Sequence, residues 1–257
     1  MEAVPAFVRL AAHPVRWRLL TELAGSDHRV RELVEQVGEP QNLVSYHLRL
    51  LRSGGLVTAR RSSHDGRDTY YHLDLARCAQ ALATAGTDLH PALRLGPVPD
   101  SAPSPDDAPR LGPEPTAAPG RRRVLFTCTG NSARSPIAAA LLRHRSAGRV
   151  EVASAGSHPK PEIHPAAVRA LRDRYGLDIA GHRPRCLDTL TGRRFDYVIT
   201  LCDKVREVCP EFPGRPRRLH WSLPDPATTD ATFDGTAAEI DARIHYLLPV
   251  LQEEVSP

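Results

Sequence analysis

The stretch RRRVLFTCTGNSARSPIAAALL, residues 121–142, decides the fold of the second half of the chain. Basic residues lead into the apolar run Val124–Phe126, which has the pattern of a buried strand. Cys128 and a few small, polar residues follow, and apolar residues at helical spacing begin after Arg134. The pattern therefore places a cysteine at the end of a buried strand, six residues before an arginine.

The rest of this region alternates between strand and helix patterns. We predict strands at residues 122–127, 150–156, 195–201 and 217–221. We predict helices at residues 135–148, 164–176 and 236–255, the last with strain at Pro249. This alternation favours an α/β domain with an open, parallel four-stranded sheet and helices on both faces. Such sheets bind ligands beyond the carboxyl ends of their strands, where Cys128 is expected.

The segment after Cys128 suits a tetrahedral oxyanion. Successive backbone N–H groups can curl around the anion, the helix N-terminus adds partial positive charge, and Arg134 offers a planar fork of donors. The same field favours the thiolate form of Cys128. The residues expected to bind the oxyanion are Thr129, Gly130, Asn131, Ser132, Ala133, Arg134 and Ser135.

Within this loop, four side chains have separate expected roles. Gly130 lets the backbone turn at low steric cost. Asn131 and Ser132 are expected to brace the loop through side-chain hydrogen bonds, and Ser135 to bond the sulfur of Cys128.

The motif VLFTCTGNSARSPIAAALL resembles the low-molecular-weight protein tyrosine phosphatase fold family. The resemblance extends to SLPDPAT, residues 222–228, where Asp225 precedes a proline. It implies that Asp225 is the general acid for the leaving group. A phosphatase would need only Cys128, Arg134 and Asp225.

Two further cysteines favour a different chemistry on the same fold. Cys202 and Cys209 lie seven residues apart in TLCDKVREVCPEF, just after a predicted strand. Together with the downstream Asp-Pro pair, they resemble the thioredoxin-linked arsenate reductases. The resemblance implies that Cys128 attacks arsenate, that Cys202 attacks the Cys128 sulfur, and that Cys209 then moves the disulfide to Cys202–Cys209. Thioredoxin or mycothiol would reduce that bond. No bound cofactor and no metal are expected.

A helix between Cys202 and Cys209 would separate them by about 10 Å, too far for a disulfide. We therefore predict that the 202–210 segment partly unwinds on oxidation. Cys186 has no partner in the motif and is expected to be structural. The resemblance also raises a potassium site held by an acidic residue after the arginine, but Ala139 stands there and no such site is predicted.

The first part of the chain has the pattern of several helices and a hairpin. Helices are predicted at residues 4–25 with a break at Pro14, at 26–38 with Ser26 or Asp27 as N-cap, at 41–55, and at 76–86. Leu56–Arg60 and Thr69–Leu73 are β-rich and flank a turn at residues 64–67. This order predicts a mainly α winged helix-turn-helix domain.

The segments LVSYHLRLLRSGGLVTARR and DGRDTYYHL, residues 43–61 and 65–73, resemble the ArsR/SmtB family of small dimeric repressors. The resemblance implies a homodimer formed through this N-terminal domain, with the second helix of the motif in the major groove of operator DNA. The helix residues expected to meet bases are Gln41, Asn42, Ser45, Tyr46 and Arg49. The wing residues expected to meet phosphates or the minor groove are Arg60, Arg61 and Arg67.

The sequence departs from this family at the inducer site. Residues 27–33, DHRVREL, lack the Cys-x-Cys pair of arsenic sensors, and Cys78 is the one thiol of this part. Asp88 and His90 form half of a metal-sensing pattern and are interpreted as surface residues. The inducer therefore stays open.

Residues 96–120 contain eight prolines and no aromatic residue, so they predict a disordered linker. The predicted domains are residues 1–95, with the winged helix-turn-helix, and residues 121–257, with the α/β fold. The net charge of +4 permits DNA binding without requiring it. Neither a signal pattern nor an apolar run of about 20 residues is present, which predicts a cytoplasmic protein that does not insert into a membrane.

The two resemblances together imply a bifunctional arsenic-resistance protein, a DNA-binding transcriptional regulator fused to an arsenate reductase. One alternative is a low-molecular-weight protein tyrosine phosphatase fused to a repressor, for which Cys202 and Cys209 would be dispensable. Another is a repressor whose second domain only binds an oxyanion.

Overall fold

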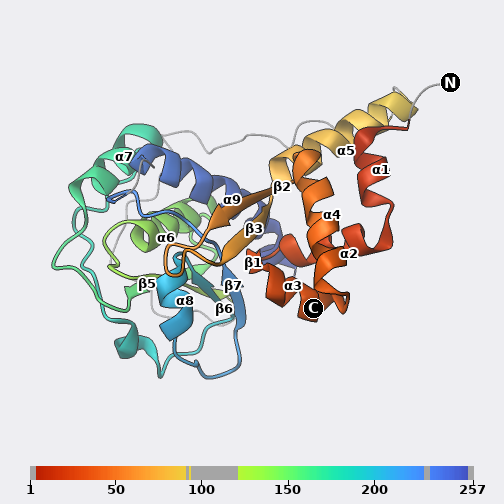
Figure 1. The fold of residues 1–257 in the computed structure, drawn as a ribbon. Coiled ribbons are helices and arrows are strands. Elements are labelled where there is room, and N and C mark those ends of the chain that lie inside the picture. The colour runs from red at the N-terminus through yellow and green to blue at the C-terminus, as the bar shows by residue number, and fades with distance from the viewer. Residues whose placement is uncertain (1–3, 91–92, 94–120, 229–231, 254–257) are drawn as a thin grey trace. The chain divides into compact units, whose positions relative to one another are not determined.

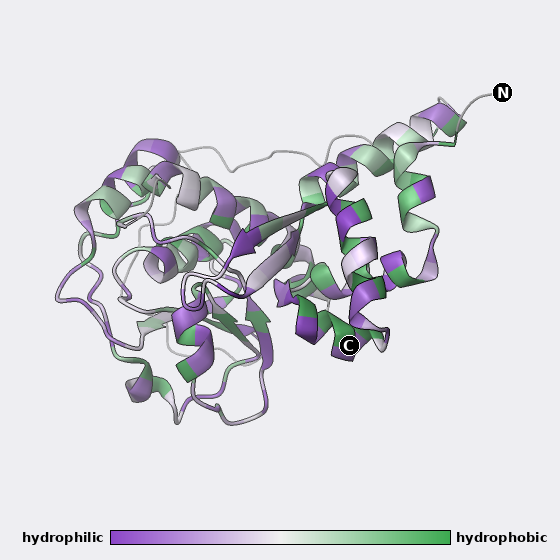
Figure 2. Cartoon of the chain, in the orientation of Figure 1, coloured by the Kyte–Doolittle hydropathy of each residue, from purple (hydrophilic) through white to green (hydrophobic). Residues whose placement is uncertain are grey.

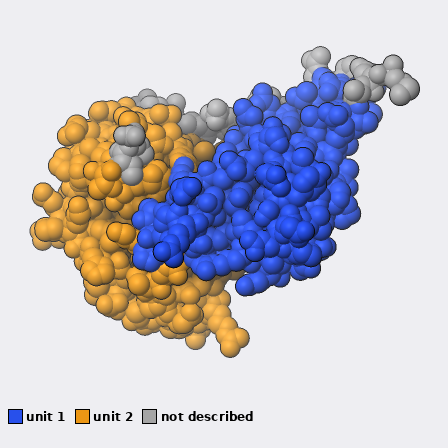
Figure 3. Space-filling model, viewed as in Figure 1, with its two compact units in different colours: residues 1–101 blue, residues 102–257 orange. Residues whose placement is uncertain are grey.

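The chain divides into two compact units, Met1–Ser101 and Ala102–Pro257 (Figure 3). The computed structural model describes residues 4–90, 93, 121–228 and 232–253. The predicted linker, residues 96–120, lies outside the described residues. Each unit has its own buried hydrophobic core.

The first unit consists of short helices and a small antiparallel sheet (Figure 1). Its helices are α1 (Ala6–Ala11), α2 (Pro14–Leu23), α3 (Val30–Val37), α4 (Gln41–Ser53) and α5 (Leu75–Leu89). Its strands are β1 (His28–Arg29), β2 (Val57–Arg61) and β3 (Thr69–Leu73), in the order β1-β3-β2. The predicted winged helix-turn-helix is confirmed, with α3 and α4 as the helix pair and β2–β3 as the wing.

Two breaks in this unit have the causes that the sequence indicated. Pro14 is the first residue of α2, where its missing N–H costs nothing. Gly38 ends α3 in a left-handed conformation with φ of 69°. Figure 2 shows hydrophilic and hydrophobic residues alternating along helices such as α4, whose buried side contributes Val44, Leu48 and Leu51 to the core.

The predicted N-cap of α3 was wrong. The cap is Arg29, whose backbone N–H donates to the Glu32 carboxylate at 2.9 Å. Asp27 is buried and lies 3.1 Å from Nδ1 of His72 on β3. The short strand β1 pairs with β3 before α3 begins, so the helix starts later than the predicted N-cap placed it.

The second unit is built on four parallel strands in the order β5-β4-β6-β7. These strands are β4 (Arg123–Cys128), β5 (Glu151–Gly156), β6 (Tyr197–Thr200) and β7 (Arg217–His220). The helices are α6 (Arg134–Arg145), α7 (Pro165–Tyr175), α8 (Asp203–Val208) and α9 (Phe233–Glu253). The predicted parallel four-stranded α/β fold is confirmed.

Helix α6 is central to this unit. All residues from Arg134 to Leu142 are buried, and α6 packs on β4, β5 and α9 (Figure 1). Helix α9 continues through Pro249, which lies on its exposed side. Cys128 is the last residue of β4 and pairs in register with Gly156 of β5. Among the described residues, no helix has the length and apolar character needed to cross a membrane.

We expect the two cores to unfold separately. Leu51→Ala, in the first core, should lower the unfolding free energy of the first unit by about 2–5 kcal/mol because it leaves a cavity. The reciprocal variant Leu171→Ala should affect the second unit alone. Calorimetry of the full chain checks this, and a shift of both transitions by either variant would contradict the predicted division into domains.

Candidate functional site

The loop between β4 and α6 has its carbonyl groups turned to one side. The carbonyl oxygens of Thr129, Gly130 and Ser132 accept hydrogen bonds from the amides of residues 158, 160 and 164, at 2.8–2.9 Å. Within the described residues, the amides of residues 129–134 donate to no backbone carbonyl. Because C=O and N–H point in opposite directions along a peptide, these amides are left available to an anion at the helix N-terminus.

Side chains fix the shape of this loop. Asn131 has a left-handed φ of 44°, and its Nδ2 donates to Ser135 Oγ at 2.9 Å and Ser154 Oγ at 3.1 Å. Its Oδ1 accepts from the amide of Arg185 at 2.9 Å. The predicted bracing role of Asn131 therefore has a geometric basis, and Ser135 Oγ lies 3.0 Å from the Cys128 sulfur, as expected.

Two details of the loop were not predicted from the sequence. The residue with a left-handed φ is Asn131, whose side chain can satisfy neighbouring groups in this conformation. Ser132 is held through its carbonyl, which accepts from the amide of His164 at 2.8 Å.

Gly156, at the end of β5, was not predicted from the sequence. A Cβ atom at this position would lie 2.6 Å from the Thr129 carbonyl oxygen and 2.8 Å from the Asn131 amide nitrogen. Any side chain here would displace the loop. The available signal was the glycine that ends the apolar strand pattern EVASAG, residues 151–156.

Arg134 is buried and directed by the loop that follows β7. Its Nη1 donates to the Leu223 carbonyl and its Nη2 to Asp225 Oδ2, both at 3.0 Å. Its Nε is buried without a hydrogen-bond partner within the described residues, so the Nε–H remains available to an anion. Asp225 also accepts from the amide of Ala227. It therefore lies beside the loop of residues 129–134, which we call the oxyanion loop, at the position expected for a general acid.

Cys202 lies beside the same loop. It directly precedes α8 and is buried, and its sulfur is 3.3 Å from Thr129 Oγ1. Burial raises the pKa of the Cys202 thiol, the neighbouring Cys128 raises it further, and the charge of Arg134 opposes both. Cys202 is thus a protonated thiol close to Cys128 and Arg134.

Cys209 lies at the other end of α8 and is half-buried. Burial raises its pKa, which the positive charge of Arg218 partly offsets. Arg218 also donates to the Cys209 carbonyl at 3.1 Å. All five cysteines are unbonded, and the helix between Cys202 and Cys209 keeps the pair about 10 Å apart.

The remaining sulfurs lie outside this arrangement. Cys186 is partly exposed, with its sulfur 3.7 Å from Asp188 Oδ2. Burial raises the pKa of Cys78 in the first unit to about 11. Asp88 and His90 are both exposed, and in the part of the chain that the structure describes no group of three or more His, Cys, Asp or Glu side chains can hold a metal ion.

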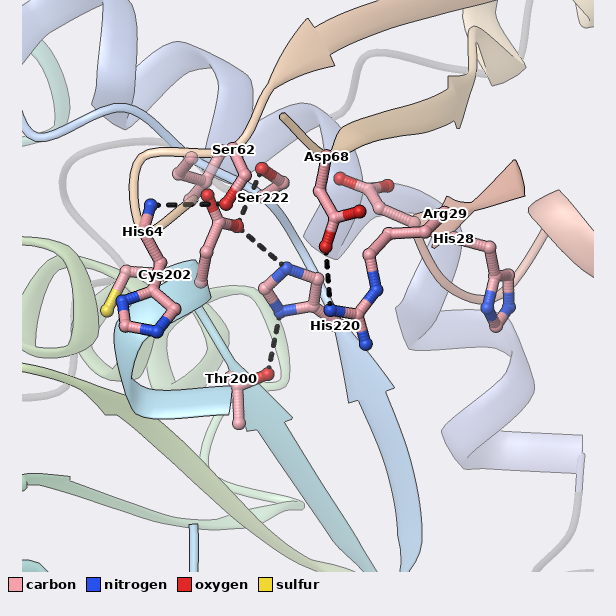
Figure 4. Close-up of polar contacts among 12 residues, drawn as sticks. His28, Arg29, Ser62, His64, Asp68, Thr200, Cys202, His220 and Ser222 are labelled. Atoms are coloured by element: carbon pink, nitrogen blue, oxygen red, sulfur yellow. Dashed lines mark hydrogen bonds and ion pairs between the residues drawn. The ribbon is translucent and has the colours of Figure 1, made fainter. Parts of the chain in front are cut away.

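The first unit presents the predicted DNA-facing residues on its surface. On α4, Gln41, Asn42, Tyr46 and Arg49 are exposed and Ser45 is half-buried. On the wing, Arg61 and Arg67 are exposed and Arg60 is half-buried. Arg61 Nη1 donates to the Gly66 carbonyl at 3.1 Å, and Arg29 of the same unit contacts Asp68 at the end of the turn (Figure 4).

The opposite side of α4 carries the buried histidine His47. The ring of His47 is 4.3 Å from the ring of His13. Burial, with the charges of His13 and Arg16, lowers the pKa of His47, which keeps the ring neutral near pH 7.

Comparison with known families agrees with both halves of this description. Residues 123–257 match the family model of low molecular weight phosphotyrosine protein phosphatase, and the chain belongs to this family. Residues 13–59 match the model of the bacterial regulatory protein, arsR family. Both resemblances drawn from the sequence are thereby confirmed.

The individual relatives that match include arsenate reductases. An arsenate reductase of Brevibacillus brevis is 34% identical over 125 residues, which cover 48% of this chain and 92% of the relative. One from Shouchella clausii is 33% identical over 131 residues, covering 48% and 93%.

Among solved structures, a thioredoxin-dependent arsenate reductase of Corynebacterium glutamicum is 39% identical with a TM-score of 0.43. The match covers 52% of this chain and 63% of that one. A low molecular weight protein tyrosine phosphatase from T. tengcongensis is 28% identical with a TM-score of 0.43, covering 50% and 99%.

We expect Gly156→Ala to weaken the binding of inorganic phosphate at least tenfold, or about 1.4 kcal/mol, because the added methyl group overlaps the loop. The control is Gly181→Ala, since a Cβ at that position meets no atom within 4 Å. Calorimetric titration of the full chain measures both. Equal affinities for the two variants would show that this loop is not the anion site.

Proposed function

We propose that the chain is a DNA-binding transcriptional regulator fused to an arsenate reductase that uses a Cys128–Cys202–Cys209 relay. The observation that carries the proposal is the position of Cys202, whose sulfur contacts Thr129 of the oxyanion loop. A phosphatase has no need of a buried thiol there. The arsenate reductases among the relatives match the same part of the chain and support this choice.

The first step binds and activates arsenate, which has the shape and charge of phosphate. The free amides of residues 129–134 and Arg134 hold the oxygens. The Cys128 thiolate attacks arsenic, and Asp225 supplies the proton with which hydroxide leaves as water. Arsenic remains pentavalent and bound to the Cys128 sulfur.

The second step reduces arsenic. The Cys202 thiolate attacks the Cys128 sulfur, an S–S bond forms, and the S–As bond breaks with its electron pair passing to arsenic. Arsenite, now trivalent, leaves. Because the pKa of Cys202 is raised, the thiol must give up its proton in this step. An oxygen of the departing arsenite accepts that proton, and the charge of Arg134 favours the Cys202 anion.

The third step removes the disulfide from the loop. Cys209 attacks the Cys202 sulfur of the Cys128–Cys202 bond and releases the Cys128 thiolate. This requires the 202–210 segment to leave its helical form, because α8 holds the two sulfurs apart. A thiol reductant then reduces Cys202–Cys209, and we propose thioredoxin for this role, with mycothiol as the alternative.

The first unit would bind operator DNA as a homodimer. Helix α5 packs against α1 and has no buried residue, and Leu82 and Leu89 are exposed along it. A second copy could cover these side chains. A reducing compartment such as the cytoplasm suits five free thiols.

Cysteine variants test the relay. We expect Cys128→Ser and Cys202→Ser to abolish arsenite release, and Cys209→Ser to allow no more than one turnover per chain. Cys186→Ser is the matched control and should keep full activity, because its sulfur lies outside the relay. The measurement is arsenate-dependent NADPH oxidation with thioredoxin and its reductase. Sustained turnover by Cys209→Ser with thioredoxin would refute the relay.

A phosphatase is the second candidate, because Cys128, Arg134 and Asp225 form a complete set for phosphomonoester hydrolysis without the other two thiols. Hydrolysis of p-nitrophenyl phosphate, unchanged by Cys202→Ser and Cys209→Ser and without any arsenate reduction, would favour it. Arsenate-dependent operator release without catalysis would favour a repressor that only binds an oxyanion.

The DNA-binding face has a separate test. Arg49→Ala should weaken binding to operator DNA and relax its specificity by about 1–3 kcal/mol if Arg49 reads a base. Arg61→Ala should weaken binding to all DNA sequences alike. It should also reduce the slope of log K against log salt concentration by about one, because one fewer counterion is released. Arg169→Ala, an exposed arginine on α7, is the control of equal charge. Fluorescence anisotropy at several salt concentrations measures all three, and no change in Arg49→Ala would remove α4 from the interface.

A further inference from the structure

Four polar side chains form a buried network next to Cys202 (Figure 4). Asp203 Oδ1 lies 3.0 Å from His220 Nε2 and accepts from Ser222 Oγ at 2.8 Å. His220 Nδ1 lies 2.8 Å from Thr200 Oγ1. All four residues are buried. We call this group the Asp203 network.

The network joins the segments that the proposed chemistry uses. Thr200 ends β6, and Cys202 follows two residues later. Asp203 is the first residue of α8. His220 ends β7, and Ser222 begins the loop that leads to Asp225. Nothing in the steps described above calls for a buried carboxylate and imidazole at this point.

Helix α8 is short and has few buried side chains. A helix of six residues is not stable by itself in water, and only Asp203 and Val205 within α8 are buried. Its far end is tied by Arg218, which contacts the carbonyls of Cys209 and Pro210 from an exposed position. Exposed contacts of this kind contribute little, whereas a buried, hydrogen-bonded carboxylate is costly to separate from its partners.

We propose that the Asp203 network holds α8 in the helical form that keeps Cys202 and Cys209 apart, and so sets the reduction potential of that pair. The proposal rests on the relay proposed above. Residues 203, 200, 220 and 222 are positioning residues, since they act through the backbone of α8 and not on arsenic.

The sign of the effect follows from linkage. The Cys202–Cys209 disulfide needs its two Cα atoms within about 7 Å, so the helix must open when the bond forms. Contacts of Asp203 that exist only in the helical form stabilise the dithiol. They therefore raise the reduction potential and make the disulfide easier for an external thiol to reduce. Loss of the network should favour the disulfide.

The test compares Asp203→Ala with Asp241→Ala in a full-length background of Cys78→Ser, Cys128→Ser and Cys186→Ser. Asp241 pairs with Arg145, so its variant also breaks an ion pair of the second unit, away from α8. Each protein is equilibrated with glutathione and glutathione disulfide. The pair gives two electrons and two protons to glutathione disulfide, which yields two glutathione molecules. The fraction of Cys202–Cys209 disulfide is then read by mass spectrometry.

We expect Asp203→Ala to raise the equilibrium constant for disulfide formation at least tenfold over the background, a change of about 30 mV to more negative potential. Asp241→Ala should leave it unchanged. Ser222→Ala, which keeps the Asp203–His220 pair, should shift it in the same direction by less, and it serves if Asp203→Ala does not fold. Thermal unfolding of the reduced proteins checks the fold.

Two results would overturn the proposal, and they differ. A background protein that forms the disulfide, with Asp203→Ala and Ser222→Ala both at the potential of Asp241→Ala, removes the network from redox control and leaves the relay standing. A background protein that forms no Cys202–Cys209 disulfide at any ratio of the two glutathione forms removes the relay, and the network's role with it.

Discussion

The second unit is organised around one requirement, that a run of peptide groups between β4 and α6 keep its amides on one side. Amides that face an anion cannot also donate to backbone carbonyls. The carbonyl groups of the same loop accept hydrogen bonds from amides of the segment after β5. Asn131 takes a left-handed conformation, and its side chain hydrogen-bonds Ser135 at the start of α6. Gly156 has no side chain, which leaves room for the loop to pass close to its backbone. Sequence positions far from Cys128 are thus fixed by the loop.

Redox chemistry adds a second requirement, which conflicts with the first. In the proposed relay the loop must be rigid, but the disulfide formed inside it has to leave. Cys202 and Cys209 lie at the two ends of the short helix α8, so the relay needs that helix to open for the disulfide to move. Because Cys202 is buried, its pKa is raised, and it is a protonated and less reactive thiol.

The sequence predicted the parts of this design that depend on local pattern. Strand–helix alternation predicted the parallel sheet, and the strand before Cys128 with the helix after Arg134 predicted the loop. The roles of Gly156 and His220 were not predicted, because they depend on which strand ends are neighbours. The sheet order β5-β4-β6-β7 cannot be read from the local sequence pattern. The left-handed φ of Asn131 and the N-cap of α3 were not predicted for the same reason. Asn131 hydrogen-bonds Ser154 and Asp27 contacts His72, and these partners are distant in the sequence.

The two units differ in how their sulfur is arranged, and this bears on regulation. Trivalent arsenic is held by several thiolates, and the first unit has Cys78 alone, with a pKa raised to about 11. Within its described residues it therefore offers no chelate for the product of the second unit. We expect a signal that reaches the first unit to come from another ligand, from a partner chain, or from the second unit. Of these, the second unit belongs to the same chain, so its effective concentration at the first unit does not depend on the concentration of the protein.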